Sequence, residues 1–146
     1  MIYFDATFLV KLHVREPGSA IIAEMVRNKN EVVATSIIAK MEVAAALHRK
    51  YREGEITQAA ILRAHDQFLR EIEVGRIAPI GLTPATVERV EVTFRMLPMT
   101  TFLRASDALH LATAADNGFK EIYSNDKHLL AAAPLFKLKG INPLAK

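Results

Sequence analysis

The stretch RASDALHLATAADNG, residues 104–118, places a carboxylate on a helix face that is otherwise apolar. It is mostly alanine and leucine, and its final Asn-Gly pair is typical of a left-handed helix end. Residues at helical spacing share the apolar face: Leu103, Asp107, His110, Leu111 and Ala114. Burying a carboxylate is costly unless a partner or a cation receives it. The sequence therefore predicts such a partner or cation beside Asp107.

The composition is that of a globular protein. The chain has 146 residues, of which 51% are hydrophobic and 24% are charged. This length supports one sizeable core rather than two, so we predict a single domain over residues 1–146. The net charge of +3 suits a polyanionic partner but does not require one.

Three features of the sequence bear on the compartment: the N-terminal stretch, the length of the apolar runs and the cysteine content. The N-terminal stretch MIYFDATFLV carries Asp5 and lacks a basic lead, which is not typical of a signal peptide. No stretch reaches the roughly 18 uncharged residues that a membrane span needs, so we expect no membrane contact. The absence of cysteine excludes disulfides and cysteine-ligated zinc. We therefore expect a cytoplasmic protein.

Short apolar strands alternate with helices along the chain. Strands are predicted at 2–4, 32–34, 76–80 and 121–124, with a last edge strand at 138–141. Helices are predicted to end near 13, 28, 52, 74, 97, 116 and 132, the third beginning from an N-cap at Thr35 or Ser36. This alternation predicts an α/β fold with a central, mostly parallel sheet of four to five short strands and helices on both faces.

Four carboxylates occupy positions from which they can converge. Asp5 and Asp126 follow predicted strands, and ligands of open parallel sheets bind at the carboxyl ends of the strands. Glu42 lies early in a helix that starts at this edge, and Asp107 lies early in its own helix. The sequence leaves open whether Asp107 reaches this edge; if all four acids converge there, they repel one another unless a cation is present.

Each acid also has a simpler interpretation, which the sequence leaves open. The simpler roles are helix N-caps for Asp5 and Asp126, a surface pair with Lys40 or Arg49 for Glu42, and a pair with Arg104 for Asp107.

If a cation receives the acids, its class follows from the donor atoms. Carboxylate oxygens without cysteine favour Mg²⁺ or Mn²⁺ over zinc. The five histidines show no metal-ligand spacing to one another. We expect His110, one turn from Asp107, to face the core or to support the site rather than to hold the ion. Carboxylate-held Mg²⁺ mostly serves phosphoryl chemistry.

Three blocks of the sequence, in this order, resemble one known family. They are FDATFLVKLHVREPGS at 4–19, TSIIAKMEVAAALHR at 35–49, and LRASDALHLATAADNGFKEIYSNDKHLLAAAP at 103–134. Together they resemble the PIN-domain ribonucleases, most closely the VapC-type toxins of toxin–antitoxin pairs, over essentially the whole chain.

The resemblance implies a metal-dependent endoribonuclease that hydrolyses RNA phosphodiester bonds to 5′-phosphate and 3′-hydroxyl products. Mg²⁺ is the implied cofactor, with Mn²⁺ as its substitute. The implied catalytic and metal-binding residues are Asp5, Glu42, Asp107 and Asp126, with Thr7 and Ser124 beside them and Arg104 and Lys11 as RNA contacts. The family often has Ser or Thr directly after the first acid, where this chain has Ala6, but no implied ligand is lost.

The resemblance also implies partners: an RNA substrate, a small cognate antitoxin and a second copy of the chain in a homodimer. Two alternatives stay open, namely a PIN nuclease of cellular RNA processing without an antitoxin, and a non-catalytic PIN module that binds RNA or protein. A phosphatase of the haloacid dehalogenase type also begins with a strand followed by Asp. It needs a second aspartate where this chain has Thr7.

Overall fold

The computed structural model describes residues 1–145, which form five strands, seven α-helices and one 3-10 helix. The strands are β1 (Ile2–Tyr3), β2 (Val33–Ser36), β3 (Ile77–Ile80), β4 (Glu121–Tyr123) and β5 (Lys139–Ile141). The helices are α1 (Ala6–His13), α2 (Ser19–Lys29), α3 (Ala39–Arg52), α4 (Gln58–Glu73), α5 (Pro84–Met96), α6 (Ala105–Asp116), α7 (Lys127–Ala132) and the 3-10 helix η1 (Ala133–Phe136). No helix within residues 1–145 is both long enough and apolar enough to cross a membrane.

All strand pairs are parallel, which confirms the predicted fold class. β2 lies between β1 and β3 in a three-stranded sheet, and β4 pairs with β5. Within the described residues the two sheets are linked by one isolated bridge between Phe4 and Tyr123. The central sheet thus has fewer strands than the predicted four to five. The reason is that α1 begins directly after Asp5, so β1 is too short to form a full ladder with β4.

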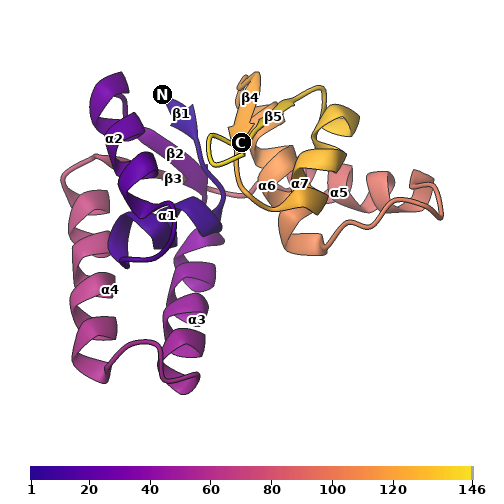
Figure 1. Ribbon diagram of the computed structural model, residues 1–146. Coiled ribbons are helices and arrows are strands. Elements are labelled where there is room, and N and C mark those ends of the chain that lie inside the picture. The colour runs from indigo at the N-terminus through magenta and orange to yellow at the C-terminus, as the bar shows by residue number, and fades with distance from the viewer. Residues whose placement is uncertain (146) are drawn as a thin grey trace.

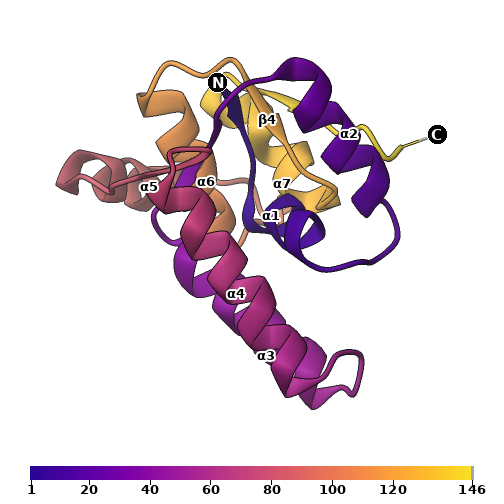
Figure 2. The same cartoon turned by 90° about the vertical axis from the view of Figure 1, so that its left-hand side faces the viewer.

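Helices cover both faces of the sheet, as predicted. Successive strand residues point to opposite faces. Ile2 and Val33 therefore belong to one buried cluster, built with α1 to α4, whereas Tyr3 and Ala34 belong to a second, built with α5 to α7. Figure 1 shows these two groups of helices on opposite sides of the strands. In both views α3 and α4 form a hairpin that extends beyond the rest of the molecule (Figure 2).

The predicted N-cap of the third helix is wrong. Thr35 and Ser36 are buried residues of β2, and α3 begins only at Ala39, with Ile38 at the N-cap position and no side-chain cap. Pairing of β2 with β3 continues through Ser36, and this pairing holds the chain extended. The predicted end of α6 is confirmed, because Gly118 has a φ of 79° directly after the C-cap residue.

Candidate active site

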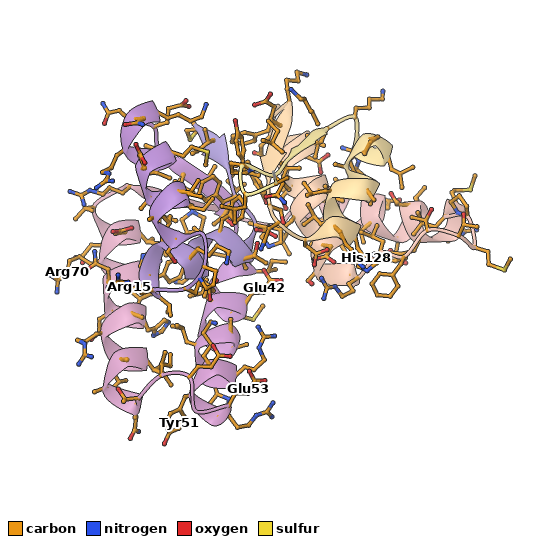
Figure 3. The ribbon with its side chains drawn as sticks, in the orientation of Figure 1. Arg15, Glu42, Tyr51, Glu53, Arg70 and His128 are labelled. Atoms are coloured by element: carbon orange, nitrogen blue, oxygen red, sulfur yellow. The ribbon has the colours of Figure 1, made fainter. Side chains whose placement is uncertain are left out.

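The four predicted acids line one cavity of about 330 Å³ at the carboxyl edge of the sheets. Asp5 follows β1 and Asp126 follows β4, while Glu42 and Asp107 lie in the first turns of α3 and α6. Glu42 lies near the upper end of α3, between the half of the molecule that holds α1 and the half that holds α6 and α7 (Figure 3). Segments more than a hundred residues apart thus bring their carboxylates to one place.

Asp5 is 3% exposed and is hydrogen-bonded through both carboxylate oxygens. Oδ1 accepts from the Thr7 hydroxyl at 2.6 Å and from the backbone N–H groups of Thr7 and Phe8, while Oδ2 accepts from the Ser124 hydroxyl at 2.6 Å. Burial raises the pKa of Asp5, and the charge of His110 and the two hydroxyls only partly offset this effect. Asp5 is therefore the N-cap of α1 and also a rigidly held carboxylate of the cavity.

Ser124 links Asp5 to Asp126. Its Oγ donates to Asp5 and accepts from the backbone N–H of Asp126 at 2.9 Å. Asp126 is the N-cap of α7 and accepts two backbone N–H groups of that helix through Oδ1. Burial favours a higher pKa for Asp126, but these N–H groups and the charge of Arg104 outweigh it, so the pKa is lowered. Asp126 is therefore held as a carboxylate.

The partner of the Asp107 carboxylate is the Arg104 guanidinium. Its Nε donates to Asp107 Oδ2 at 2.8 Å, and its Nη2 donates to Asp126 Oδ2. The Arg104 side chain is 54% exposed, whereas that of Asp107 is 10% exposed. The pair between Asp107 and Arg104, the simpler of the two interpretations of Asp107, is thus observed in the structure. A positive group already lies between two of the acids.

Glu42 pairs with His110 rather than with Lys40 or Arg49. The Nε2 atom of His110 lies 2.6 Å from Glu42 Oε2, and its Nδ1 atom lies 3.2 Å from the Tyr3 hydroxyl. Burial raises the pKa of Tyr3 well above its usual value, so this hydroxyl stays protonated. The imidazole therefore lies between the Tyr3 hydroxyl and the Glu42 carboxylate, with one ring nitrogen toward each. His110 is both a core residue and the support of Glu42.

A second charge cluster lines the same cavity. Both carboxylate oxygens of Glu16, in the loop after α1, accept from lysines: Oε1 from Lys11 Nζ and Oε2 from Lys50 Nζ, each at 2.6 Å. Burial favours a higher pKa for Glu16, but the two lysines outweigh it and lower the pKa. Lys11, predicted from the sequence as an RNA contact, is therefore engaged with Glu16.

Lys50 and Glu16 also line the cavity, and neither is predicted as a cavity residue from the sequence. For Lys50 a signal exists, because Glu42, Ala46, Arg49 and Lys50 follow i, i+4, i+7, i+8 spacing and so share one face of α3. For Glu16 the sequence holds no comparable signal, because it lies in a loop whose path depends on the tertiary structure.

The donor set of the cavity suits a hard divalent cation, but the acids are not gathered around one point. All four candidates offer carboxylate oxygens, which Mg²⁺ and Mn²⁺ prefer. Within residues 1–145, however, no three acidic or histidine side chains form a group that is ready to hold a metal ion. Arg104 bridges two of the acids, and His110 engages a third. Arg104 and His110 therefore engage three of the four carboxylates that an ion would use, and hydroxyl and backbone N–H groups satisfy the fourth, Asp5.

A parallel α/β fold with acids at the carboxyl edge matches a known class of protein. The model of the PIN domain family matches residues 2–134. The chain therefore belongs to the PIN-domain family. Among curated relatives, it is 33% identical over 114 residues to Ribonuclease VapC45 of Mycobacterium tuberculosis, a match that covers 78% of this chain and 74% of the relative. The resemblance to VapC-type proteins is thus confirmed.

Solved structures share the fold. The crystal structure of M. tuberculosis VapC20, described as a toxin that cleaves the sarcin–ricin loop, has a TM-score of 0.71 at 19% identity and covers 90% of this chain and 95% of that chain. VapBC2 from Rickettsia felis, bound to a DNA fragment from their promoter, has a TM-score of 0.59 at 16% identity and covers 97% of this chain and 98% of that chain. At these identities the likeness concerns the fold.

Proposed function

We propose that this chain is a metal-dependent endoribonuclease that hydrolyses RNA phosphodiester bonds. The observation that carries the proposal is one cavity lined by four carboxylates from separate segments. The curated relative is named a ribonuclease, which supports RNA as the substrate. The same cavity carries basic side chains that suit a polyanionic substrate: Lys11, Arg49, Lys50 and Arg104.

Asp5 and Asp107 would hold the principal Mg²⁺ or Mn²⁺ ion, and Asp126 would assist. The position of Arg104 supports this assignment, because two of these acids already share a cation. When bound, such an ion activates water and neutralises negative charge on the phosphate. Thr7 and Ser124 keep the Asp5 carboxylate in one orientation through two hydroxyl hydrogen bonds.

Glu42 would position the attacking water and take its proton. The hydrogen bond from His110 holds the Glu42 carboxylate in place, so the base does not have to be ordered during the reaction. The water oxygen would form a bond to phosphorus while the bond from phosphorus to the 3′-oxygen breaks, and the leaving 3′-oxygen would take a proton from solvent. The products are a 5′-phosphate and a 3′-hydroxyl.

Cleavage of total RNA by the purified protein tests this function. We expect cutting with Mn²⁺ or Mg²⁺, none with EDTA, and none by Asp107→Asn. Asp66→Asn, which removes an exposed acid of α4 outside the cavity, serves as the matched control and should cut like the parent. Cutting that persists in EDTA, or in Asp107→Asn, would refute the metal-dependent mechanism. If no RNA is cut and calorimetry detects no Mn²⁺ binding, the chain is a non-catalytic binding module.

We further propose that the chain is the cytoplasmic toxin of a toxin–antitoxin pair and forms a homodimer. Its VapC-type relatives support the toxin role. Met96, Met99 and Phe102 are exposed, and such apolar surface is available for protein contacts. Coexpression with the short reading frame beside its gene should yield a complex that no longer cuts RNA. Light scattering of the free chain should give the mass of a dimer.

The alternative to the toxin role is a nuclease of cellular RNA processing. If the chain cuts RNA but no neighbouring gene product binds or inhibits it, the processing nuclease is the correct assignment. The metal-dependent activity would remain established in that case.

A further inference from the structure

We propose that Lys11, Arg49 and Lys50 form a subsite for the RNA phosphate next to the one that is cleaved. The three side chains line the cavity that holds the four acids. The inference rests on the proposed nuclease function and assigns to these cations the binding of a neighbouring phosphodiester group.

The two helices that carry the cations also carry two of the acids. α1 and α3 pack against each other, with Asp5 at the start of α1 and Glu42 in the first turn of α3. Lys11 comes six residues after Asp5, and Lys50 comes eight residues after Glu42. At 1.5 Å per residue these offsets are about 9 Å and 12 Å along the helices. These offsets place the lysines farther along the two helices than the acids, and we therefore assign the lysines to a neighbouring phosphate.

The two lysines are held in position before any RNA binds. Their side chains are 10% and 13% exposed for Lys11 and Lys50, and both donate to Glu16. Lys11 also donates to the Pro17 carbonyl at 2.9 Å, and Lys50 to Glu55 at 3.0 Å. An ammonium group has three N–H donors, and these contacts use two of each. Each lysine therefore keeps one donor for a ligand, at little further cost in side-chain entropy.

The charges of the cluster leave a surplus that matches one phosphodiester. The cluster contains three cations, Lys11, Arg49 and Lys50, and the two carboxylates that pair with the lysines, Glu16 and Glu55, so these five groups together have a net charge of +1. An ion pair that served only to join α1 to the following loop needs one lysine. The second lysine and the exposed Arg49 go beyond that structural need.

Binding of single-stranded RNA tests the subsite. The probe is a labelled RNA of about 12 nucleotides, titrated by fluorescence anisotropy at several salt concentrations. All proteins carry Asp107→Asn so that the RNA stays intact. We expect Lys11→Met, Arg49→Gln and Lys50→Met each to weaken binding at least about threefold. Each should also lower the slope of log affinity against log salt, and the triple variant should lower it by about 0.7, the value for one lost phosphate contact.

The matched control is Lys120→Met, which removes one exposed positive charge outside the cavity. It should leave the slope unchanged. If the subsite variants behave like Lys120→Met, the subsite is refuted. Arg49 is exposed, so Arg49→Gln decides the question even where a lysine variant fails to fold.

A second measurement separates a binding role from a structural one. Glu16→Gln removes the carboxylate that opposes the two lysines, so we expect tighter RNA binding. If Glu16→Gln lowers the melting temperature and leaves RNA affinity unchanged, the cluster is an ion pair of structural importance only. Cleavage by the parent chain is scored separately. If the subsite variants bind RNA like the control and the parent still cleaves RNA, only this inference is overturned. If the parent does not cleave RNA, the proposed function is overturned.

Discussion

His110 of α6 holds the carboxylate of Glu42 of α3 through a contact of 2.6 Å between Nε2 and Oε2. The imidazole is 1% exposed and is anchored on its other side by the Tyr3 hydroxyl at 3.2 Å. Of these three groups, Tyr3 does not line the cavity, His110 lines it but is almost fully buried, and the Glu42 side chain is the most exposed at 27%. His110 is a positioning residue, and Glu42 is the group that would touch the reacting water.

Replacement of His110 tests this relationship. We expect His110→Leu to lower the rate of RNA cleavage in Mn²⁺ by about 10- to 100-fold, since Glu42 loses the donor that orients it. His110→Gln keeps an N–H donor and should retain more activity than His110→Leu. The measurement is kcat on one defined RNA, with the melting temperature of each variant recorded in parallel. Equal activity of the two variants would show that His110 contributes packing alone.

Asp5→Asn is expected to abolish cleavage without destabilising the metal-free protein. The variant removes a buried negative charge, and the amide still accepts from the Thr7 and Phe8 N–H groups and can donate to Ser124 Oγ. In EDTA we expect the melting temperature to stay equal or to rise by about 2–4 °C. A scan of thermal unfolding measures this, with Asp66→Asn as the surface control. A clear drop in EDTA would contradict the prediction.

Arg104→Gln is expected to lower the stability of the metal-free protein and to raise its affinity for Mn²⁺. Loss of the guanidinium leaves Asp107 and Asp126 facing each other, so the metal-free melting temperature should fall by about 2–4 °C. The same loss removes a competing cation, so Mn²⁺ should bind about fivefold more tightly in calorimetric titration.

Arg104→Lys is the control for charge, because it keeps the positive group but cannot bridge two carboxylates through a planar fork. It should fall between the parent and Arg104→Gln in both measurements. Weaker Mn²⁺ binding by Arg104→Gln would show that the arginine assists the ion rather than competing with it.

Glu16 is expected to make stability depend on pH in the acidic range. Its pKa is lowered from the usual 4.5, because the lysine partners outweigh the effect of burial. A carboxylate whose pKa is lower in the folded state stabilises the fold above 4.5, and this contribution is lost as the pH falls through the lower folded value. The parent should therefore be more stable than Glu16→Gln at neutral pH, and the difference should vanish in acid.

Urea unfolding of both proteins at neutral pH and in steps below 4.5 measures this difference. Glu24→Gln, which removes an exposed acid of α2, should show no such dependence. A gap between parent and Glu16→Gln that persists undiminished into strong acid would contradict the assigned role of Glu16.

Local patterns predicted most of the elements and the edge of the sheet at which the acids lie. The helix face shared by Leu103, Asp107 and Leu111 predicted α6. The Asn-Gly pair predicted where this helix ends, because glycine readily adopts the left-handed conformation found at Gly118. The start of α3 could not be predicted in this way. Thr35 is a good N-cap residue by local preference, but pairing with β3, more than forty residues later in the chain, keeps it in a strand.

The amino-acid sequence by itself determined the α/β class, the parallel strands and the placement of Asp5, Glu42 and Asp126 at one edge, because these depend on periodicity and on where strands end. The tertiary structure brought Asp107 to the same cavity. Only the tertiary structure decided how each carboxylate is satisfied. Three contacts illustrate this: His110 with Glu42, Arg104 with Asp126, and Lys50 with Glu16. In each, the two residues are between 22 and 68 positions apart in the sequence. Such contacts depend on the packing of whole helices, which no local spacing encodes.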